Sequence, residues 1–292
     1  MQRSLELRLK AVLPGPIGRT LRRVDNYRKR LLLWRAISHE MHGVGPSDRR
    51  ALRRSALASP FLALRNLYRW QDPVLLEDAL VEVHGVGQFK VRARSDDLWH
   101  ALPSREPAVF AAIRDNLKPG DTFIDAGANI GIFSVLAGRQ VGKQGRVLAV
   151  EMMPDTAAIL AQHLNINGIE CATVVEKALS DRGGVTLKAH VVEGRFGMAS
   201  VARQESSGKE IEVQTMTLDQ VASGVEKIAL IKMDLEGAEI NALQGARGAL
   251  AKTRMILFEQ LGGEDRPAAF LRDQGFDVRN LEGDNFIGSK AG

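Results

Sequence analysis

Residues 123–134 read FIDAGANIGIFS, in which a carboxylate and two glycines stand where an apolar strand would meet an apolar helix. In sheets built from alternating strands and helices, ligands bind at the carboxyl ends of the strands, where glycine lets the backbone approach a ligand closely. That place is occupied by Asp125, Gly127, Asn129 and Gly131. A tight turn in which Asp125 or Asn129 caps the helix would use the same residues, and spacing alone leaves both interpretations open.

A second acid, Glu151, favours the ligand-binding interpretation. It ends the next apolar strand, GRVLAVE, twenty residues after Gly131. Nucleoside-binding folds place an acid at about this separation because one carboxylate can accept hydrogen bonds from two ribose hydroxyls. Taken alone, Glu151 would more simply cap the helix that begins near Pro154. Together, within one strand–helix–strand unit, the glycine turn and the acid predict a nucleoside cofactor.

The loop spacing distinguishes between nucleoside cofactors. A dinucleotide loop needs G-x-G-x-x-G so that a diphosphate can lie on the helix N-terminus. Here the spacing is G-x-x-x-G, and Asp125 before it would repel a diphosphate, which disfavours an NAD-dependent oxidoreductase. The segment GRQVGKQG (138–145) also lacks the spacing and the Ser or Thr of an ATP-binding loop. An α-amino group and a positive sulfonium would suit an acidic turn, so the sequence predicts S-adenosylmethionine.

Further acids follow two later strands. Asp234 ends one strand, Glu236 and Glu239 come just after it, and Glu259 ends the next. Because an alcohol must lose its proton when it is methylated, we expect Asp234 or Glu236 to act as the general base or to orient the cofactor's amino group. Glu236 and Glu239 could instead favour a helix N-terminus, and Glu259 is a further rim acid. We expect no metal, although neighbouring acids could form an oxygen-rich site. Four histidines without ligand spacing are expected to be structural or exposed: His84, His100, His163 and His190.

These motifs follow one another in the order of a known family. The chain resembles the FkbM-type methyltransferases over roughly residues 106–262, through DAGANIGIFS (125–134), Glu151, EKALSDRGG (176–184), TLD (217–219), IKMDLEGAE (231–239) and ILFEQ (256–260). The resemblance implies S-adenosylmethionine-dependent, largely O-methylating activity and a class I Rossmann-like α/β fold, with a mostly parallel seven-stranded sheet and helices on both faces. It also implies the cofactor contacts: the amino-acid end at Asp125, Gly127, Asn129 and Gly131, the ribose at Glu151, and adenine near Ala178.

The elements that would position these residues begin near residue 106. Strand-like and helix-like segments alternate from there, which is typical of a mainly parallel sheet. We expect strands near 122–126, 146–151, 172–176, 228–234 and 254–259, helices near 130–140, 155–167 and 237–250, and an interruption at 185–224 with strand-like pieces and a short helix. The methyltransferase domain should therefore span 106–292, after a β-hairpin lead-in at 71–105.

Residues 1–70 form a basic segment that we expect to be a helical N-terminal extension. The net charge of the 292 residues is +5, but this segment carries sixteen Lys or Arg and four Asp or Glu, so the remainder is acidic overall. One apolar helical stripe, surrounded by arginines, contains Leu21, Val24, Tyr27, Leu31 and Trp34. The stretch at 18–38 could pack on the domain or a second subunit, contact an anionic membrane, or serve as a transit peptide. We do not expect nucleic acid as a partner, because no aromatic stacking surface accompanies the charge.

The composition sets the remaining expectations. The single cysteine, Cys171, cannot form an internal disulfide, and no apolar run is long enough for a membrane span or a secretory signal. We therefore expect a cytoplasmic protein, with peripheral membrane contact as a variant. The expected function is methyl transfer from S-adenosylmethionine to a hydroxyl of a sugar, glycolipid or secondary metabolite. The alternative is a non-catalytic nucleoside-binding module tethered to a membrane or partner by its basic segment.

Overall fold

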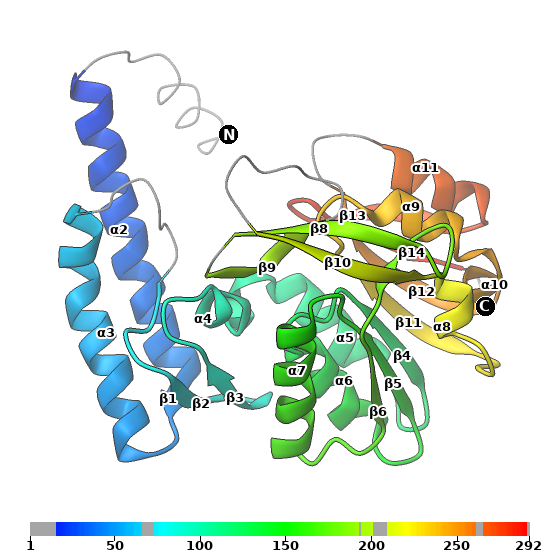
Figure 1. Cartoon of the computed structure of the whole chain (residues 1–292), viewed down its shortest axis with the longest axis horizontal. Helices are drawn as coiled ribbons and strands as arrows, with labels where there is room; N and C mark the ends of the chain where they lie inside the picture. The colour runs from blue at the N-terminus through cyan, green and yellow to red at the C-terminus, as the bar shows by residue number, and fades with distance from the viewer. Residues whose placement is uncertain (1–15, 66–72, 193, 201–208, 261–264, 291–292) are drawn as a thin grey trace.

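The structure is a computed structural model that describes residues 16–65, 73–192, 194–200, 209–260 and 265–290 (Figure 1). Its centre is a seven-stranded sheet in the order β13-β14-β12-β11-β4-β5-β6. The strands run parallel except β14, which is antiparallel to both of its neighbours. They are β4 Thr122–Ala126, β5 Arg146–Val150, β6 Ala172–Val175, β11 Ile228–Met233, β12 Thr253–Glu259, β13 Asp277–Glu282 and β14 Asn285–Ser289. The five expected strands all occur, with ends within one residue of the prediction.

Both faces of the central sheet are covered by helices. Consecutive residues of a strand point to opposite faces, so Phe123 packs with α5, α6 and α7, whereas Ile124 packs with α8, α9, α10 and α11. In β11 all six residues are buried, as is usual for a central parallel strand. The helices are α5 Pro107–Asn116, α6 Ile132–Val141, α7 Pro154–Ile166, α8 Leu218–Val221, α9 Glu239–Gln244, α10 Arg247–Ala251 and α11 Arg266–Asp273. The α/β fold expected from the sequence is confirmed.

The single helix expected at 237–250 is in fact two short helices, α9 and α10. The chain bends at Gly245, where a Cβ atom would overlap the carbonyl oxygen of Ser180. Asp219 then accepts hydrogen bonds from the backbone N–H groups of Gly248 (3.1 Å) and Ala249 (2.6 Å) and so caps the start of α10. The break therefore depends on contacts with distant segments, which the local pattern does not contain.

The interruption expected at 185–224 contributes three strands of a second, smaller sheet. Four strands join in the order β7-β10-β8-β9. They are β7 Ala178–Leu179, β8 Thr186–Val192, β9 Arg195–Ser200 and β10 Lys209–Met216. The short helix α8 follows this sheet and begins with a capping box in which Thr217 and Gln220 each bond the other's backbone N–H.

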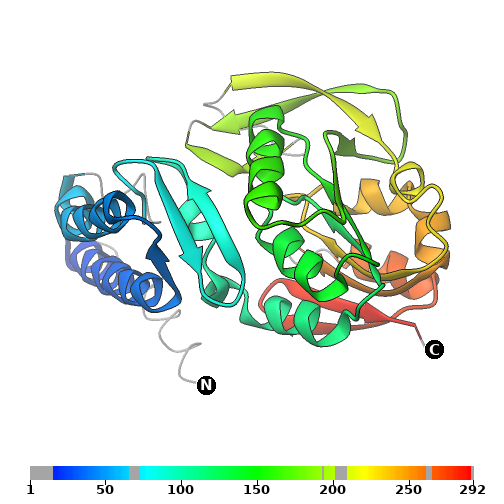
Figure 2. The same ribbon diagram turned by 90° about the horizontal axis from the view of Figure 1, so that it is seen from below.

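The described part of the basic N-terminal segment is mostly helical and also contains a short strand that was not expected. A short strand, β1, separates its two long helices and pairs with the hairpin, so that the lead-in is a three-stranded sheet in the order β1-β2-β3. The elements are α2 Pro16–Glu40, β1 Met41–Gly43, α3 Pro46–Arg65, β2 Ala79–Val83, β3 Gly87–Val91, α4 Asp97–His100 and the 3-10 turn η1 Pro103–Arg105. Figure 2 shows α2 and α3 on one side of this small sheet and the main domain on the other.

The helical layer and the main domain share one hydrophobic core. Trp34, Ile37 and Met41 are buried in the same cluster as Phe89 and Phe123. Part of the expected apolar stripe thus packs inward, although Leu31 is half exposed. The side chains of Leu21, Val24 and Tyr27 lie outside the described residues. Among the helices that the structure describes, none combines the length and the apolar character needed to cross a bilayer.

Candidate active site

A cleft opens at the carboxyl ends of β4, β5 and β11, where ligands bind in folds of this type. It holds about 840 Å³ of empty space, counting the part open to solvent. Six of the residues expected from the sequence line it: Gly127, Asn129, Glu151, Ala178, Asp234 and Glu236. The other two, Asp125 and Gly131, are not among the lining residues.

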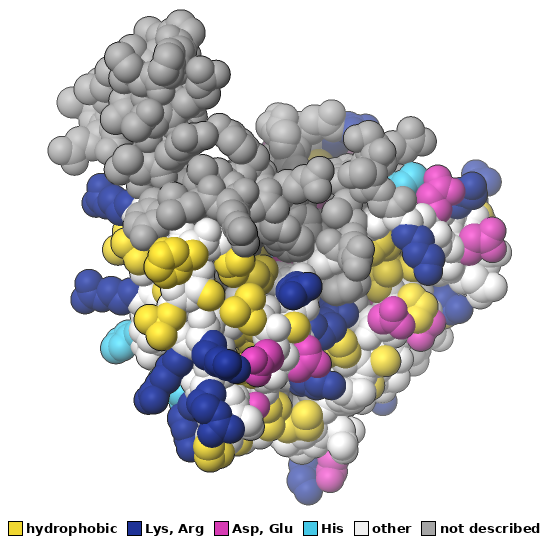
Figure 3. All heavy atoms as spheres, turned by 60° about the vertical axis from the view of Figure 1, so that its left-hand side comes forward, with side chains coloured by type: hydrophobic (Ala, Val, Ile, Leu, Met, Phe, Trp, Pro, Cys, Tyr) yellow, Lys and Arg dark blue, Asp and Glu magenta, His cyan; other side chains and the backbone are white. Residues whose placement is uncertain are grey.

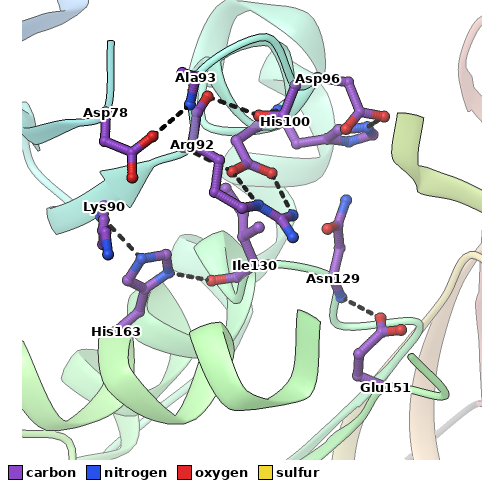
Figure 4. A network of polar contacts seen from close by, with 12 residues as sticks. Asp78, Lys90, Arg92, Ala93, Asp96, His100, Asn129, Ile130, Glu151 and His163 are labelled. Atoms are coloured by element: carbon purple, nitrogen blue, oxygen red, sulfur yellow. Dashed lines mark hydrogen bonds and ion pairs between the residues drawn. The ribbon is translucent and has the colours of Figure 1, made fainter. Parts of the chain in front are cut away.

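Glu151 connects the two loops on one side of the cleft. One carboxylate oxygen accepts the backbone N–H of Asn129 (2.9 Å), and the other accepts that of Met153 (2.8 Å). Figure 4 shows Asn129 directed at this carboxylate from the loop after β4. Burial raises the pKa of Glu151 to about 7, although the two backbone donors favour the charged form. Glu151 therefore fixes the loop geometry and still has lone pairs for a ligand hydroxyl.

The glycine loop has the backbone conformation that close packing requires. Gly127 (φ 82°) and Asn129 (φ 49°) are left-handed, a region that glycine and asparagine tolerate better than other residues. A Cβ atom at Gly127 would overlap the carbonyl oxygen of Asp234, so the loops after β4 and β11 touch through this glycine. At Gly131 (φ 88°) a Cβ atom would overlap Leu160 of α7. Gly131 therefore permits helix packing beneath the cleft.

Asp125 lies fully buried below the cleft floor. Its Oδ2 accepts the hydroxyl of Ser134 at 2.6 Å, and burial raises its pKa, an effect that Lys232 partly offsets. Within the described part of the chain, Oδ1 of Asp125 and Oδ1 of Asn129 are buried without a hydrogen-bond partner. Buried acceptors of this kind are costly unless a ligand or water satisfies them.

Asp234 forms a buried ion pair with Lys232. The Lys232 ammonium lies 3.1 Å from the Asp234 carboxylate and 4.9 Å from the centre of the Phe133 ring. Burial disfavours the charged form of both side chains, but the neighbouring charges have the larger combined effect. The pKa of Lys232 is raised by Asp234 and Asp125, and the pKa of Asp234 is lowered by Lys232 and Arg105. Asp234 is therefore ionised at neutral pH.

Glu236 and Glu239 differ in their surroundings. Glu236 lines the cleft in a left-handed conformation (φ 52°), and such non-glycine strain is concentrated at functional sites. Glu239 instead accepts the backbone N–H groups of Leu235 (2.8 Å) and Gly237 (3.2 Å). The helix-start role considered from the sequence thus suits Glu239, whereas Glu236 lines the cleft.

Three acids, Asp234, Glu239 and Glu259, lie close enough to bind a single cation, with one oxygen of each within 4.8 Å of the others. Donors already occupy Asp234 and Glu239, as described above. Burial, with the negative charges of Asp234 and Glu236, raises the pKa of Glu259 to about 8. The raised pKa favours the protonated form of Glu259, which relieves the repulsion within the cluster. The absence of a metal remains a prediction.

Sequence reasoning did not assign several residues that line the cleft, among them His100, Arg105 and Lys232. The Nε2 atom of His100 lies 3.3 Å from the carboxylate of Asp96, and its Nδ1 atom faces the Arg105 guanidinium. Since arginine only donates, Nδ1 must accept and Nε2–H must donate to Asp96. The four-residue spacing of Asp96 and His100 on α4 was a signal for their pairing. Nothing in the sequence placed α4 at the cleft.

A second buried histidine, His163, supports the glycine loop from behind. Its Nδ1 donates to the carbonyl oxygen of Ile130 (2.7 Å), and its Nε2 accepts the backbone N–H of Lys90 (2.8 Å). Figure 4 shows the ring of His163 between these two segments. Burial lowers the pKa of His163, so the ring is neutral. It thereby joins the lead-in sheet to the loop that carries Asn129.

Comparison with known proteins agrees with this architecture. A family model described as the methyltransferase FkbM domain matches residues 125–279. Methyltransferase sdnD from Sordaria araneosa is 27% identical over 203 residues, which cover 56% of this chain and 76% of that protein. The 2-O-methyltransferase NoeI from Sinorhizobium fredii is 28% identical over 159 residues, which cover 49% of this chain and 64% of that protein. The chain thus spans less than two thirds of the length of the second relative.

Solved structures also resemble the chain at low identity. The methyltransferase FkbM from Methylobacillus flagellatus is 16% identical with a TM-score of 0.41, over 66% of this chain and 53% of that one. An S-adenosylmethionine-dependent O-methyltransferase from Thermotoga maritima is 14% identical with a TM-score of 0.44, over 73% and 77%. Because the family model alone matches more than half of its length, the chain belongs to the FkbM methyltransferase family.

Proposed function

We propose that this methyltransferase transfers a methyl group from S-adenosylmethionine to a hydroxyl of a sugar, glycolipid or other small molecule. The observation that carries the proposal is the placement of Glu151 on the cleft wall beside the glycine loop, where a carboxylate can accept the two hydroxyls of a ribose. The relative named as a 2-O-methyltransferase supports a hydroxyl acceptor.

The residues present fit this cofactor at each end. Glu151 would hold the ribose, and the apolar wall at Met152, Ala178 and Leu179 would receive the adenine. The unpartnered oxygen of Asn129 would accept a hydrogen bond from the α-ammonium group. A buried acceptor that lacks a partner in the protein is thus satisfied by a donor of the ligand.

Arg105 is the residue that we assign to the α-carboxylate. Two other cations of the cleft are engaged: Lys177 donates to Gln214 (3.1 Å), and Lys232 pairs with Asp234. Arg105 bonds His100 and pairs with Glu106 (3.3 Å), which uses only part of its five N–H donors. The chain Asp96–His100–Arg105 fixes the guanidinium at the cleft wall, and a fixed guanidinium can bind a carboxylate with two parallel hydrogen bonds.

The acids on the other wall would handle the acceptor. When bound, S-adenosylmethionine supplies the methyl group as an activated sulfonium. Asp234, held ionised by Lys232 and Arg105, accepts a hydrogen bond from the acceptor hydroxyl and so orients its oxygen. Asp234 or Glu236 then takes the proton that the hydroxyl loses. Uptake of that proton by a fixed carboxylate distinguishes this enzyme from a module that only binds a nucleoside.

Calorimetric titration with S-adenosylhomocysteine tests the cofactor assignment, with NADH and ATP as controls. We expect binding of S-adenosylhomocysteine alone, and Glu151→Ala should weaken it by about tenfold or more, since a lost charge-assisted hydrogen bond costs about 1.5–3 kcal/mol. Binding that is indifferent to Glu151, or equal binding of NADH, would refute the ribose contact.

The catalytic acids need a separate test. We expect Asp234→Asn and Glu236→Gln each to slow methyl transfer to hydroxyl acceptors by about 10²–10⁴-fold, the usual contribution of a positioned acid or base. Incorporation of labelled methyl groups measures the rate, and titration with S-adenosylhomocysteine shows whether the cleft is intact. Full activity in both variants would remove these residues from the mechanism.

A further inference from the structure

The outer side of the two N-terminal helices exposes large apolar side chains. Among the described residues, five of the eight exposed large apolar side chains lie on α2 and α3, and Leu57 and Phe61 are 74% and 72% exposed. We call this group the apolar face: Leu31, Leu32, Leu57, Phe61 and Leu62. Figure 3, which brings this side of the molecule forward, shows hydrophobic side chains gathered with Lys and Arg around them.

The most exposed part of the apolar face, Leu57 and Phe61, lies away from the side by which these helices join the core, whereas Leu31, three residues before the buried Trp34, lies at the edge of that side. Trp34, Ile37 and Ala51 point inward, and the buried Ser55 accepts the backbone N–H of Leu76 (2.9 Å). Leu57 and Phe61 stand four residues apart, so they share one stripe of α3 that the inward residues do not occupy. The exposed residues are therefore additional to the packing that holds the helices to the sheet.

The described parts of α2 and α3 carry more basic than acidic side chains. Seven basic residues on the described parts of α2 and α3 are exposed, and one of them, Arg54, pairs with Glu77 (2.9 Å). They are Arg28, Lys29, Arg35, Arg49, Arg50, Arg53 and Arg54. The two acids among residues 28–62 serve the protein's own backbone: Glu40 accepts the N–H of Ser104 (2.9 Å), and Asp48 accepts that of Gly45 (2.8 Å). The outer surface thus combines apolar side chains with excess positive charge.

We propose that the apolar face docks on the surface of a membrane containing anionic lipids. Leucine and phenylalanine enter the boundary between headgroups and acyl chains, while flanking arginines bind anionic headgroups. A two-fold contact between copies of this chain would instead bring arginines against arginines. Nucleic acid would use the arginines but offers no apolar environment to the four exposed leucines and the phenylalanine of this face. Lipid is the partner that uses both properties.

Vesicle sedimentation of the full chain tests the proposal. We expect the protein to sediment with phosphatidylcholine vesicles that contain phosphatidylserine, and to stay in solution with phosphatidylcholine alone. Leu57→Glu combined with Phe61→Glu should lower partitioning by about tenfold or more, because it removes apolar insertion and adds repulsion. The exposed Ile166 and Val185 supply matched controls, since Ile166→Glu and Val185→Glu add the same charges elsewhere.

The competing occupants give different results. The proposal is overturned if the protein fails to sediment with anionic vesicles. It is also overturned if the variant with Ile166→Glu and Val185→Glu loses as much vesicle partitioning as the variant with Leu57→Glu and Phe61→Glu. If the Leu57→Glu and Phe61→Glu variant changes from dimer to monomer in gel filtration and vesicle binding is absent, the face is an interface between copies. Since both residues are exposed, unchanged circular dichroism is expected for every variant.

Discussion

At Glu151, burial and function act on the same carboxylate in opposite directions. Burial raises its pKa to about 7, whereas acceptance of two ribose hydroxyls requires the ionised form. The carboxylate is charged above that pKa and protonated below it, so affinity for S-adenosylhomocysteine should fall as the pH drops from about 8 to about 6. The loss should approach about tenfold per pH unit below the pKa.

Titration calorimetry at several pH values checks this prediction. Glu151→Gln is the matched control, because its amide keeps the size and loses the titration. We expect that variant to bind weakly at every pH, with a flat profile. A wild-type profile as flat as that of Glu151→Gln would contradict a titrating contact between Glu151 and the ligand.

Arg105 allows a sharper test, because two ligands differ in the group that it would bind. S-adenosylhomocysteine carries the α-carboxylate, and methylthioadenosine lacks the whole amino-acid end. We expect Arg105→Gln to weaken the first by about tenfold or more, as a lost charge-assisted hydrogen bond would, and to leave the second unchanged. Calorimetry measures both, with the exposed Arg114→Gln as control. Equal weakening of both ligands would mean that Arg105 only shapes the loop.

At the scale of elements, side chains at the C-terminal end of α7 hydrogen-bond the backbone of strand β3. His163 and Asn167, four residues apart on α7, bond the backbone of Lys90 and Gln88. His163→Ala would leave the Lys90 N–H and the Ile130 carbonyl unpaired, so we expect the free energy of unfolding to fall by about 1–3 kcal/mol for each group. Urea denaturation measures the change, with the exposed His39→Ala as control.

The same histidine predicts a pH dependence of stability. Burial lowers its pKa from the ordinary value of 6.5, so the unfolded chain takes up the proton first as the pH falls. Stability should therefore decrease below about pH 6.5, and His163→Ala should remove this part of the decrease. An unchanged pH profile in His163→Ala would show that other groups control acid unfolding.

Local signals explain how much of the fold could be predicted from sequence. The five predicted strands of the main sheet are short apolar runs, a feature that is visible without tertiary contacts, whereas β13 (DVRNLE) is mostly polar and was not predicted. The strand at 41–43 depends on pairing with β2, and the break at Gly245 depends on Asp219, both far along the chain. The local pattern therefore predicts helix at both places. The same limit applies to the site. Glu151 and Gly127 follow from their places in one motif, whereas Arg105, on η1, reaches the cleft through tertiary packing that no local motif indicates.

For the whole molecule, the shared core makes the basic segment part of the folding unit. Ile37 is fully buried in the cluster that also contains Phe123 of the central sheet, so we expect both regions to unfold together. Ile37→Ala should lower the free energy of unfolding by about 2–5 kcal/mol, the usual effect of such a core truncation. Leu32→Ala on the same helix is the control, and we expect it to change little because Leu32 is half exposed.

Denaturation followed by two probes decides whether this coupling exists. The far-ultraviolet signal reports all helices, whereas stabilisation by S-adenosylhomocysteine reports the cleft, because a ligand stabilises only the cooperative unit that binds it. If the core is shared, Ile37→Ala shifts both signals together in a single transition. If the helical layer folds by itself, Ile37→Ala splits off an early transition that the ligand does not move. In that case the layer could separate from the domain on a membrane, whereas a single transition means that it docks as a rigid part of the enzyme.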